Sequence, residues 1–210
     1  MPPAKSPAEV AALIVRRDPT FKSVVGRAGP PPRWRSARVD DRFSALVRSI
    51  TFQLLATKAA DTIHRRVRDL CDQSVTTESI MRVGVDQLRG AGLSRTKAEA
   101  MVDLADQASD RRVQLSRHGR MSDDDVIRDV TAVRGIGPWT AHMYLLGTLA
   151  RTDVWPVGDF GVRNGWSIVH GLDETISEAD LRGAGEKFEG VRSSVAWYCW
   201  QAVHLDRQAN

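Results

Sequence analysis

The most informative segment of this 210-residue chain is VRGIGPWTA, residues 133–141. A Gly-x-Gly pattern lets the backbone reverse tightly, and Pro138 is well tolerated at the first position of a helix. The stretch therefore predicts a helical hairpin over about 123–150. The bare amides of Gly135, Ile136 and Gly137, beside the start of the new helix, form a natural phosphate site. The other interpretation is a plain helix–helix corner in which the glycines serve packing alone.

Helical periodicity dominates on both sides of this hairpin, and the alternation typical of strands is almost absent. Apolar residues at helical spacing predict helices over about 43–54, 59–70, 98–105, 126–133 and 195–203. Suitable N-cap side chains precede further helices: one of Thr76 and Thr77, then Ser94, Ser122 and Ser177. The chain is therefore predicted to be all-α, with residues 1–40 as an N-terminal extension that packs on a domain of residues 41–210.

Downstream of the hairpin the chain reads VWPVGDFGVRNGW over residues 154–166. The first part is a loop, and Asp159 is placed to cap a helix from about Phe160 to Val169. Backbone amides and the local helix dipole favour a negative charge at such a position. Asp159 is either a helix cap alone or a cap that also takes part in chemistry.

Composition limits the class of protein. Hydrophobic residues make up 42% and charged residues 27%, which is an ordinary globular balance. No apolar run reaches the roughly 18–20 residues that span a bilayer, and the N-terminus lacks a secretory pattern, so we expect a cytoplasmic protein. The net charge of +4 leans mildly toward an anionic partner. The only cysteines, Cys71 and Cys199, cannot form a four-cysteine iron–sulfur or zinc site, and no transition metal is expected.

The combination GIGPWTA…VWPVGD resembles the helix-hairpin-helix (HhH-GPD) DNA glycosylase superfamily, with the DNA-3-methyladenine glycosylase II branch as its nearest match. Similar segments are RSITFQLLATKAA (48–60), GLSRTKAEAMVDLA (92–105) and VRSSVAWYCW (191–200), so the resemblance covers about residues 40–205. It implies a two-lobed helical core with an active-site cleft between the lobes. It also implies a glycosylase that flips alkylated purines of the 3-methyladenine type out of double-stranded DNA, excises them and leaves an abasic site for base excision repair.

The resemblance makes Asp159, in the loop and helix of about 154–169, the catalytic carboxylate. It would stabilise the positive charge that builds on the deoxyribose, and would orient or deprotonate the attacking water. Bifunctional members of the superfamily carry a lysine at the second position after the hairpin's second glycine, and here that position is Trp139. The enzyme is therefore expected to be monofunctional and to leave the strand intact.

The matching family has a Gln-Leu pair between the first two helices, whose leucine enters the duplex, and here the pair is Gln53-Leu54. Leu54 also continues a helical stripe, so it is either this wedge or ordinary core. Trp139 is the leading candidate for the wall of an aromatic base pocket. Phe52, Met143 and Trp155 are weaker candidates, because a tryptophan at helical spacing is more often core. The residues expected to contact DNA are Gln53, Leu54, Lys58, Arg134, Gly135, Ile136, Gly137 and Thr140.

Two positions depart from the family pattern. Val191 stands where relatives often have an aromatic before Arg-Ser, and Met143 stands where an aromatic often follows the hairpin. The pocket is thus less aromatic, which leaves open a preference for oxidised, deaminated or ethenoadenine bases, or a non-catalytic DNA-binding module. No cofactor is expected, beyond a structural K⁺ or Na⁺ on the backbone carbonyls of Thr131, Val133 and Ile136. A monomer is the expected state.

Overall fold

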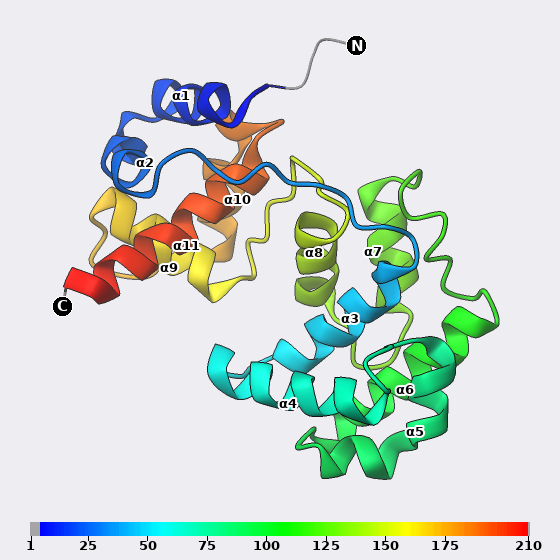
Figure 1. Cartoon of the computed structure of the whole chain (residues 1–210). Coiled ribbons are helices and arrows are strands. Elements are labelled where there is room, and N and C mark those ends of the chain that lie inside the picture. The colour runs from blue at the N-terminus through cyan, green and yellow to red at the C-terminus, as the bar shows by residue number, and fades with distance from the viewer. Residues whose placement is uncertain (1–4, 210) are drawn as a thin grey trace. The chain divides into compact units, whose positions relative to one another are not determined.

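The computed structural model describes residues 5–209, and over this range it contains helices and no strand (Figure 1). The all-α prediction is confirmed. The helices are α1 Pro7–Arg17, η1 Pro19–Phe21, α2 Lys22–Ala28, α3 Asp41–Phe52, α4 Thr57–Leu70, α5 Thr77–Gly90, α6 Arg95–Ser109, α7 Asp123–Thr131, α8 Pro138–Gly147, α9 Phe160–His170, α10 Glu178–Ala184, η2 Glu186–Phe188 and α11 Arg192–Ala209.

The described helices form two compact units. The terminal unit consists of residues 5–34 and 151–209, and the hairpin unit consists of residues 35–150. The boundary expected at residue 40 differs from this division, because residues up to 34 pack in the same unit as the C-terminal helices. There α2 contacts α11, and α1 contacts η2.

The helices α1 and α2 were not expected from the sequence, although α1 carries a clear start signal. Ser6 and Glu9 form a capping box: the amide of Glu9 donates to Ser6 Oγ at 3.3 Å, and the amide of Ser6 donates to Glu9 Oε2 at 2.7 Å. Pro7 follows at the first helical position. Buried Leu13 and Ile14 then place this helix in the core of the terminal unit.

The other predicted helix starts are confirmed. Thr76, Ser94, Ser122 and Ser177 each accept a bond from the amide three residues later, at 3.1–3.3 Å. The helix expected to run as far as Leu54 instead ends at Phe52, so that part of the prediction is wrong. The C-terminal helix is longer than expected, since α11 covers Arg192–Ala209.

In the terminal unit, α9 lies directly against α11 (Figure 1). Gly165 makes this close approach possible, because a Cβ atom there would lie 1.9 Å from the Cys199 carbonyl oxygen. The buried Asp18 ties the N-terminal segment to both ends of this region: Oδ2 contacts His170 Nε2 at 3.0 Å and Lys187 Nζ at 2.8 Å. Burial raises the pKa of Asp18, but the bonds from Lys187, Thr20 and His170 outweigh it and hold that pKa well below its usual value.

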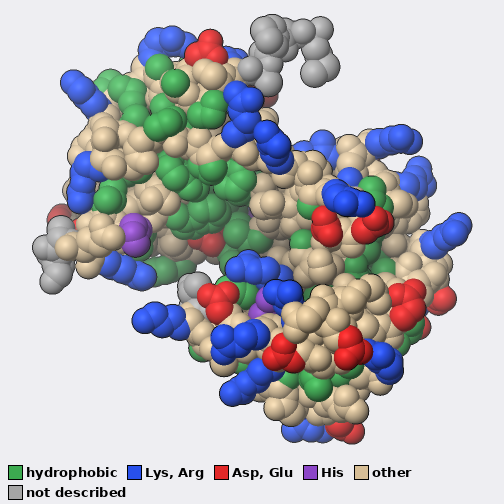
Figure 2. Space-filling view, viewed as in Figure 1, with side chains coloured by type: hydrophobic (Ala, Val, Ile, Leu, Met, Phe, Trp, Pro, Cys, Tyr) green, Lys and Arg blue, Asp and Glu red, His purple; other side chains and the backbone are tan. Residues whose placement is uncertain are grey.

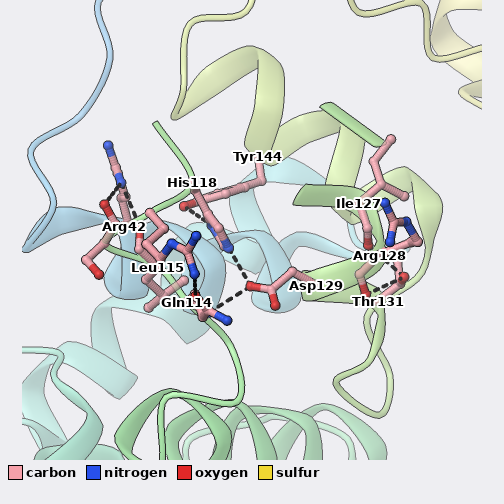
Figure 3. A network of polar contacts seen from close by, with 11 residues as sticks. Arg42, Gln114, Leu115, His118, Ile127, Arg128, Asp129, Thr131 and Tyr144 are labelled. Atoms are coloured by element: carbon pink, nitrogen blue, oxygen red, sulfur yellow. Dashed lines mark hydrogen bonds and ion pairs between the residues drawn. The ribbon is translucent and has the colours of Figure 1, made fainter. Parts of the chain in front are cut away.

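In the hairpin unit, α3 packs against α6 and α8, while α7 packs against α8. A buried polar network braces the α7–α8 pair (Figure 3). His118 is fully buried, with Nε2 2.6 Å from Asp129 Oδ2 and Nδ1 3.0 Å from the Tyr144 hydroxyl. The same Asp129 oxygen accepts the Gln114 amide at 2.8 Å, and Arg42 donates to the Leu115 carbonyl at 2.6 Å. Neutral His118 satisfies both neighbours, with Nε2–H donating to the carboxylate and Nδ1 accepting from the hydroxyl.

This network predicts that the protein loses stability as the pH falls below about 6.5. Burial lowers the pKa of His118 and outweighs the opposing effect of Asp129. The folded state therefore binds fewer protons than the unfolded state, and the stabilisation is lost as the pH falls from the unfolded pKa toward the folded one. His118→Gln is expected to destabilise the protein by about 1–3 kcal/mol at pH 7.5, because the Tyr144 hydroxyl loses its acceptor. The stability that this variant loses between pH 7.5 and pH 5.5, measured by thermal unfolding, should be smaller than the stability that the wild type loses. An equal loss would contradict the assignment of His118 as neutral in the folded protein.

Candidate functional site

Asp159 caps α9 and is held from two helices. Its Oδ1 accepts the Val162 amide at 2.8 Å and the indole N–H of Trp200 at 3.0 Å. Trp200 lies on α11, so the packing of α9 on α11 sets the orientation of the carboxylate. Only 8% of Asp159 is exposed. Gly161 leaves the room for this arrangement, since a Cβ atom there would lie 3.0 Å from Trp200 Cδ1 and 3.1 Å from Asp159 Oδ1.

Trp200 was not among the site residues expected from the sequence. No sequence signal distinguishes it from the other tryptophan of α11, because helical spacing alone does not tell a core side chain from one that touches a carboxylate. Its neighbour Cys199 is fully buried, and burial together with the charge of Asp159 raises the pKa of its thiol. Cys199 therefore stays protonated and is no nucleophile.

A large apolar side chain is exposed at the start of α9. Phe160, directly after Asp159, is 63% exposed, and the Arg163 guanidinium lies 6.0 Å from its ring centroid. Figure 2 shows hydrophobic side chains gathered on the terminal unit, with lysines and arginines distributed around them. Exposed apolar side chains that gather in one patch are typical of a surface that receives a ligand, whereas a single one is not.

The predicted hairpin is present between α7 and α8. Gly135 has φ +84°, and a Cβ atom there would lie 2.9 Å from Ala100 Cβ, so both conformation and space require glycine. The Ile136 side chain is buried, and its amide donates to the Val133 carbonyl at 3.1 Å. The next helix, α8, begins at Pro138 with no side-chain cap. The start of a helix presents backbone amides and the positive end of the helix dipole, which together favour an anion such as a phosphate.

The Gln53–Leu54 turn lies directly against this hairpin. Gln53 Nε2 donates to the Gly135 carbonyl at 3.1 Å and to Thr140 Oγ1 at 2.8 Å. Leu54 has φ +52° and its side chain is fully exposed, so the interpretation of Leu54 as core is wrong. Thr140 is buried, and its hydroxyl binds Gln53 instead of facing solvent. Lys58, in the first turn of α4, is exposed.

Arg134 is exposed on the hairpin turn, while its backbone amide donates to Asp103 Oδ2 at 2.8 Å. That bond anchors the turn to α6 and leaves the guanidinium on the surface. The same hairpin thus combines an exposed cation, glycines and uncapped amides, which is the chemistry that binds a phosphate backbone without reading bases.

The four candidates for a base pocket fall in different surroundings. Trp139 and Met143 are half-buried one turn apart on α8, so they share a face. Phe52 is half-buried under the Arg48 guanidinium, 4.0 Å from its ring centroid. Trp155 belongs to the terminal unit, where its indole N–H donates to the Leu181 carbonyl at 2.8 Å. Its ring packs edge-on against Trp166, with 6.0 Å between centroids, so Trp155 serves the packing of its own unit.

The family model described as the HhH-GPD superfamily base excision DNA repair protein matches residues 47–188. The chain belongs to this superfamily. It is 28% identical over 191 residues to DNA-3-methyladenine glycosylase 1 of Schizosaccharomyces pombe, an alignment that covers 90% of this chain and 84% of that protein.

Two solved structures are similar to this HhH-GPD protein over nearly its whole length. The 3-methyladenine DNA glycosylase of Schizosaccharomyces pombe, in complex with abasic DNA, has a TM-score of 0.84 and 26% identity and covers 92% of this chain and 95% of its own. The DNA-3-methyladenine glycosidase of Bacillus halodurans has a TM-score of 0.80 and 29% identity, with 97% and 92% covered.

In this HhH-GPD protein the hairpin carries Trp139 where bifunctional members carry lysine, and residues 133–150 contain no lysine at all. Within the described part of the chain, no three His, Cys, Asp or Glu side chains gather as a metal-binding group. Over that same part, no helix is both long and apolar enough to cross a membrane.

Proposed function

We propose that this HhH-GPD protein is a monofunctional DNA glycosylase that excises alkylated purines of the 3-methyladenine type from double-stranded DNA. The observation that carries the proposal is the Asp159 carboxylate at the start of α9, held by the Val162 amide and the Trp200 indole. It works as a monomer in base excision repair, and its substrate places it with the nucleoid in the cytoplasm.

The chemistry follows from the charge that develops during hydrolysis. As the bond between C1′ and the base nitrogen breaks, its electron pair leaves with the base and the deoxyribose becomes positive. A fixed carboxylate in a protected site stabilises that charge more than solvent does. Asp159 also orients the water whose oxygen bonds to C1′ and takes up its proton. Two donors on Oδ1 hold the carboxylate in place, so little reorganisation is needed during the reaction.

The residues of the hairpin unit bind the DNA. The uncapped amides at the start of α8 bind a phosphate, and Arg134 and Lys58 add charge. The exposed Leu54 fills the space that the flipped base vacates, while Trp139 and Met143 offer a face for stacking. Flipping costs a few kcal/mol, and this cost is smallest for a damaged base.

A structural K⁺ or Na⁺ on the hairpin is part of the proposal. The Val133 carbonyl accepts the Ile136 amide, and a carbonyl oxygen has a second lone pair for a cation. Thr131 and Ile136 would supply further carbonyls. Such an ion would brace the turn and help to neutralise a phosphate; the reaction itself needs no cofactor.

The absence of a hairpin lysine gives the first test. A duplex with one alkylated purine, incubated with excess enzyme, should break at the lesion only after hot alkali, because the enzyme leaves an abasic site. The same assay on duplexes with ethenoadenine, deaminated and oxidised purines measures preference, which Val191 and Met143 leave open. Strand breaks without alkali would contradict the monofunctional assignment. Binding without release from any lesion would favour a DNA-binding module.

A further inference from the structure

Lys97 is turned inward, toward the end of another helix. It lies on α6 and is half-buried, and its Nζ donates to the Gln53 carbonyl at 2.5 Å and to the Thr51 carbonyl at 3.0 Å. These carbonyls belong to the end of α3, where the last carbonyls of a helix have no partner within the helix. A cation there also complements the helix dipole. Lys97 thus satisfies the end of α3 in place of a glycine cap.

The bond to Gln53 bears directly on Leu54. The Gln53 carbonyl and the Leu54 amide belong to the same planar peptide group, so holding the carbonyl orients the backbone that enters Leu54. Leu54 has φ +52°, a conformation that leucine disfavours, and its fully exposed side chain gains no packing that would compensate. Such a conformation persists only where surrounding groups hold it. Those groups are backbone and side-chain partners of Gln53.

Gln53 is held from both sides. Its carbonyl is bound by Lys97, and its side chain is bound by Gly135 and Thr140 of the hairpin. The turn that presents Leu54 is therefore linked to α6 and to α8, all within the hairpin unit. Lys97 is the member of this set whose charge makes its bonds strong, since charged donors give about twice the strength of neutral ones.

We propose that Lys97 is a positioning residue that holds Leu54 in its extruded conformation by binding the Thr51 and Gln53 carbonyls, so that the wedge is formed before DNA arrives. The consequence for catalysis rests on the proposed function, in which Leu54 fills the space left by the flipped base. Lys97 itself touches neither the base nor the sugar, and its contribution is preorganisation of the turn.

The first experiment measures hydrogen exchange in the free protein and needs no activity. In Lys97→Met, which keeps most of the side chain's length and removes its charge and donors, the hydrogen-bonded amides at the end of α3, residues 51–53, are expected to exchange about tenfold faster, as for a loss of about 1.4 kcal/mol. Unchanged exchange of the amides of α9 and α11 serves as the control that the variant remains folded. Lys97→Arg retains charge and donors and should restore most of the protection. Unchanged exchange in Lys97→Met would overturn the inference.

The second experiment is a double-mutant cycle with Leu54→Ala in single-turnover excision at saturating enzyme. Lys97→Met alone is expected to slow excision about tenfold, and to slow it less than about twofold further when Leu54 is already alanine. If the rate reductions of the two single variants instead multiply in the double variant, Lys97 acts independently of Leu54, which would overturn the inference. If wild type excises nothing, the proposed function fails, while the exchange experiment still decides whether Lys97 holds the turn.

Salt dependence separates positioning from phosphate contact. A lysine that binds a phosphate changes the slope of log affinity against log salt by about 1. Lys97→Met should leave that slope unchanged on undamaged duplex, whereas Lys58→Met, at an exposed lysine of the neighbouring helix, should reduce it by about 1. Lys22→Met in the terminal unit provides a lysine outside the binding surface and should change none of these measurements. A reduced slope in Lys97→Met would identify it as a phosphate ligand and overturn the inference.

Discussion

Asp159→Asn is expected to lower the single-turnover rate of base excision by about 10²–10³-fold or more, because the charge that faces the developing oxocarbenium ion is removed. Asparagine keeps a side-chain oxygen that accepts the Val162 amide and the Trp200 indole, so the helix cap and the position of α11 persist. Thermal stability and affinity for duplex should therefore change little. The measurement is the excision rate at saturating enzyme on a duplex with one alkylated purine, read after alkali.

Asp180→Asn is a matched control for this substitution. Asp180 is an exposed carboxylate in the first turn of α10, where its amide donates to the Ser177 cap, much as Asp159 lies at the start of α9. The excision rate of Asp180→Asn should equal that of the wild type. If Asp159→Asn kept its rate within about threefold, the carboxylate would be a helix cap alone, and a DNA-binding role for the chain would be favoured.

Gly165→Ala is expected to destabilise the protein by about 3 kcal/mol or more, which corresponds to roughly 6–12 °C in Tm for a chain of this size. The new Cβ would lie 1.9 Å from the Cys199 carbonyl oxygen and 2.4 Å from its carbonyl carbon, and neither backbone atom can rotate away as a side chain would. Relief requires α9 and α11 to move apart. Because Trp200 lies next to Cys199 on α11, its bond to Asp159 should lengthen as well. Excision is therefore expected to slow even below the unfolding temperature.

Gly183→Ala tests whether this effect is specific to the contact. Gly183 lies in α10, and a Cβ atom added there would have no neighbour within 4 Å, so alanine should be neutral or stabilise the helix by up to about 1 kcal/mol. Thermal unfolding of both variants is the measurement. Equal Tm values for Gly165→Ala and wild type would mean that α9 and α11 are farther apart than the structure shows.

Much of the fold follows from local signals. The caps at Ser94, Ser122 and Ser177 and the Gly135–Pro138 turn lie where the sequence predicts them, because capping and positive-φ requirements depend only on nearby residues. The same logic extends to α1, whose Ser6–Glu9 capping box and Pro7 are local signals that predict a helix start. The end of α3 cannot be predicted from local sequence for a physical reason: Leu54 fits a helical stripe, and only the distant Lys97 and the hairpin hold it out of the helix.

Four features can be predicted from residue identity and short spacing alone: the all-α class, the hairpin, the position of Asp159 at a helix start and the lack of a hairpin lysine. The partners of these residues, in contrast, depend on how the helices pack. Trp200 reaches Asp159 from α11, Thr140 turns inward to Gln53, and Trp155 binds Leu181 in its own unit. Such contacts join residues far apart in the chain. A tryptophan or threonine that contacts a site residue cannot be told in the sequence from one that packs elsewhere. Only the packing of α9 on α11, and of α3 on α6 and α8, distinguishes them.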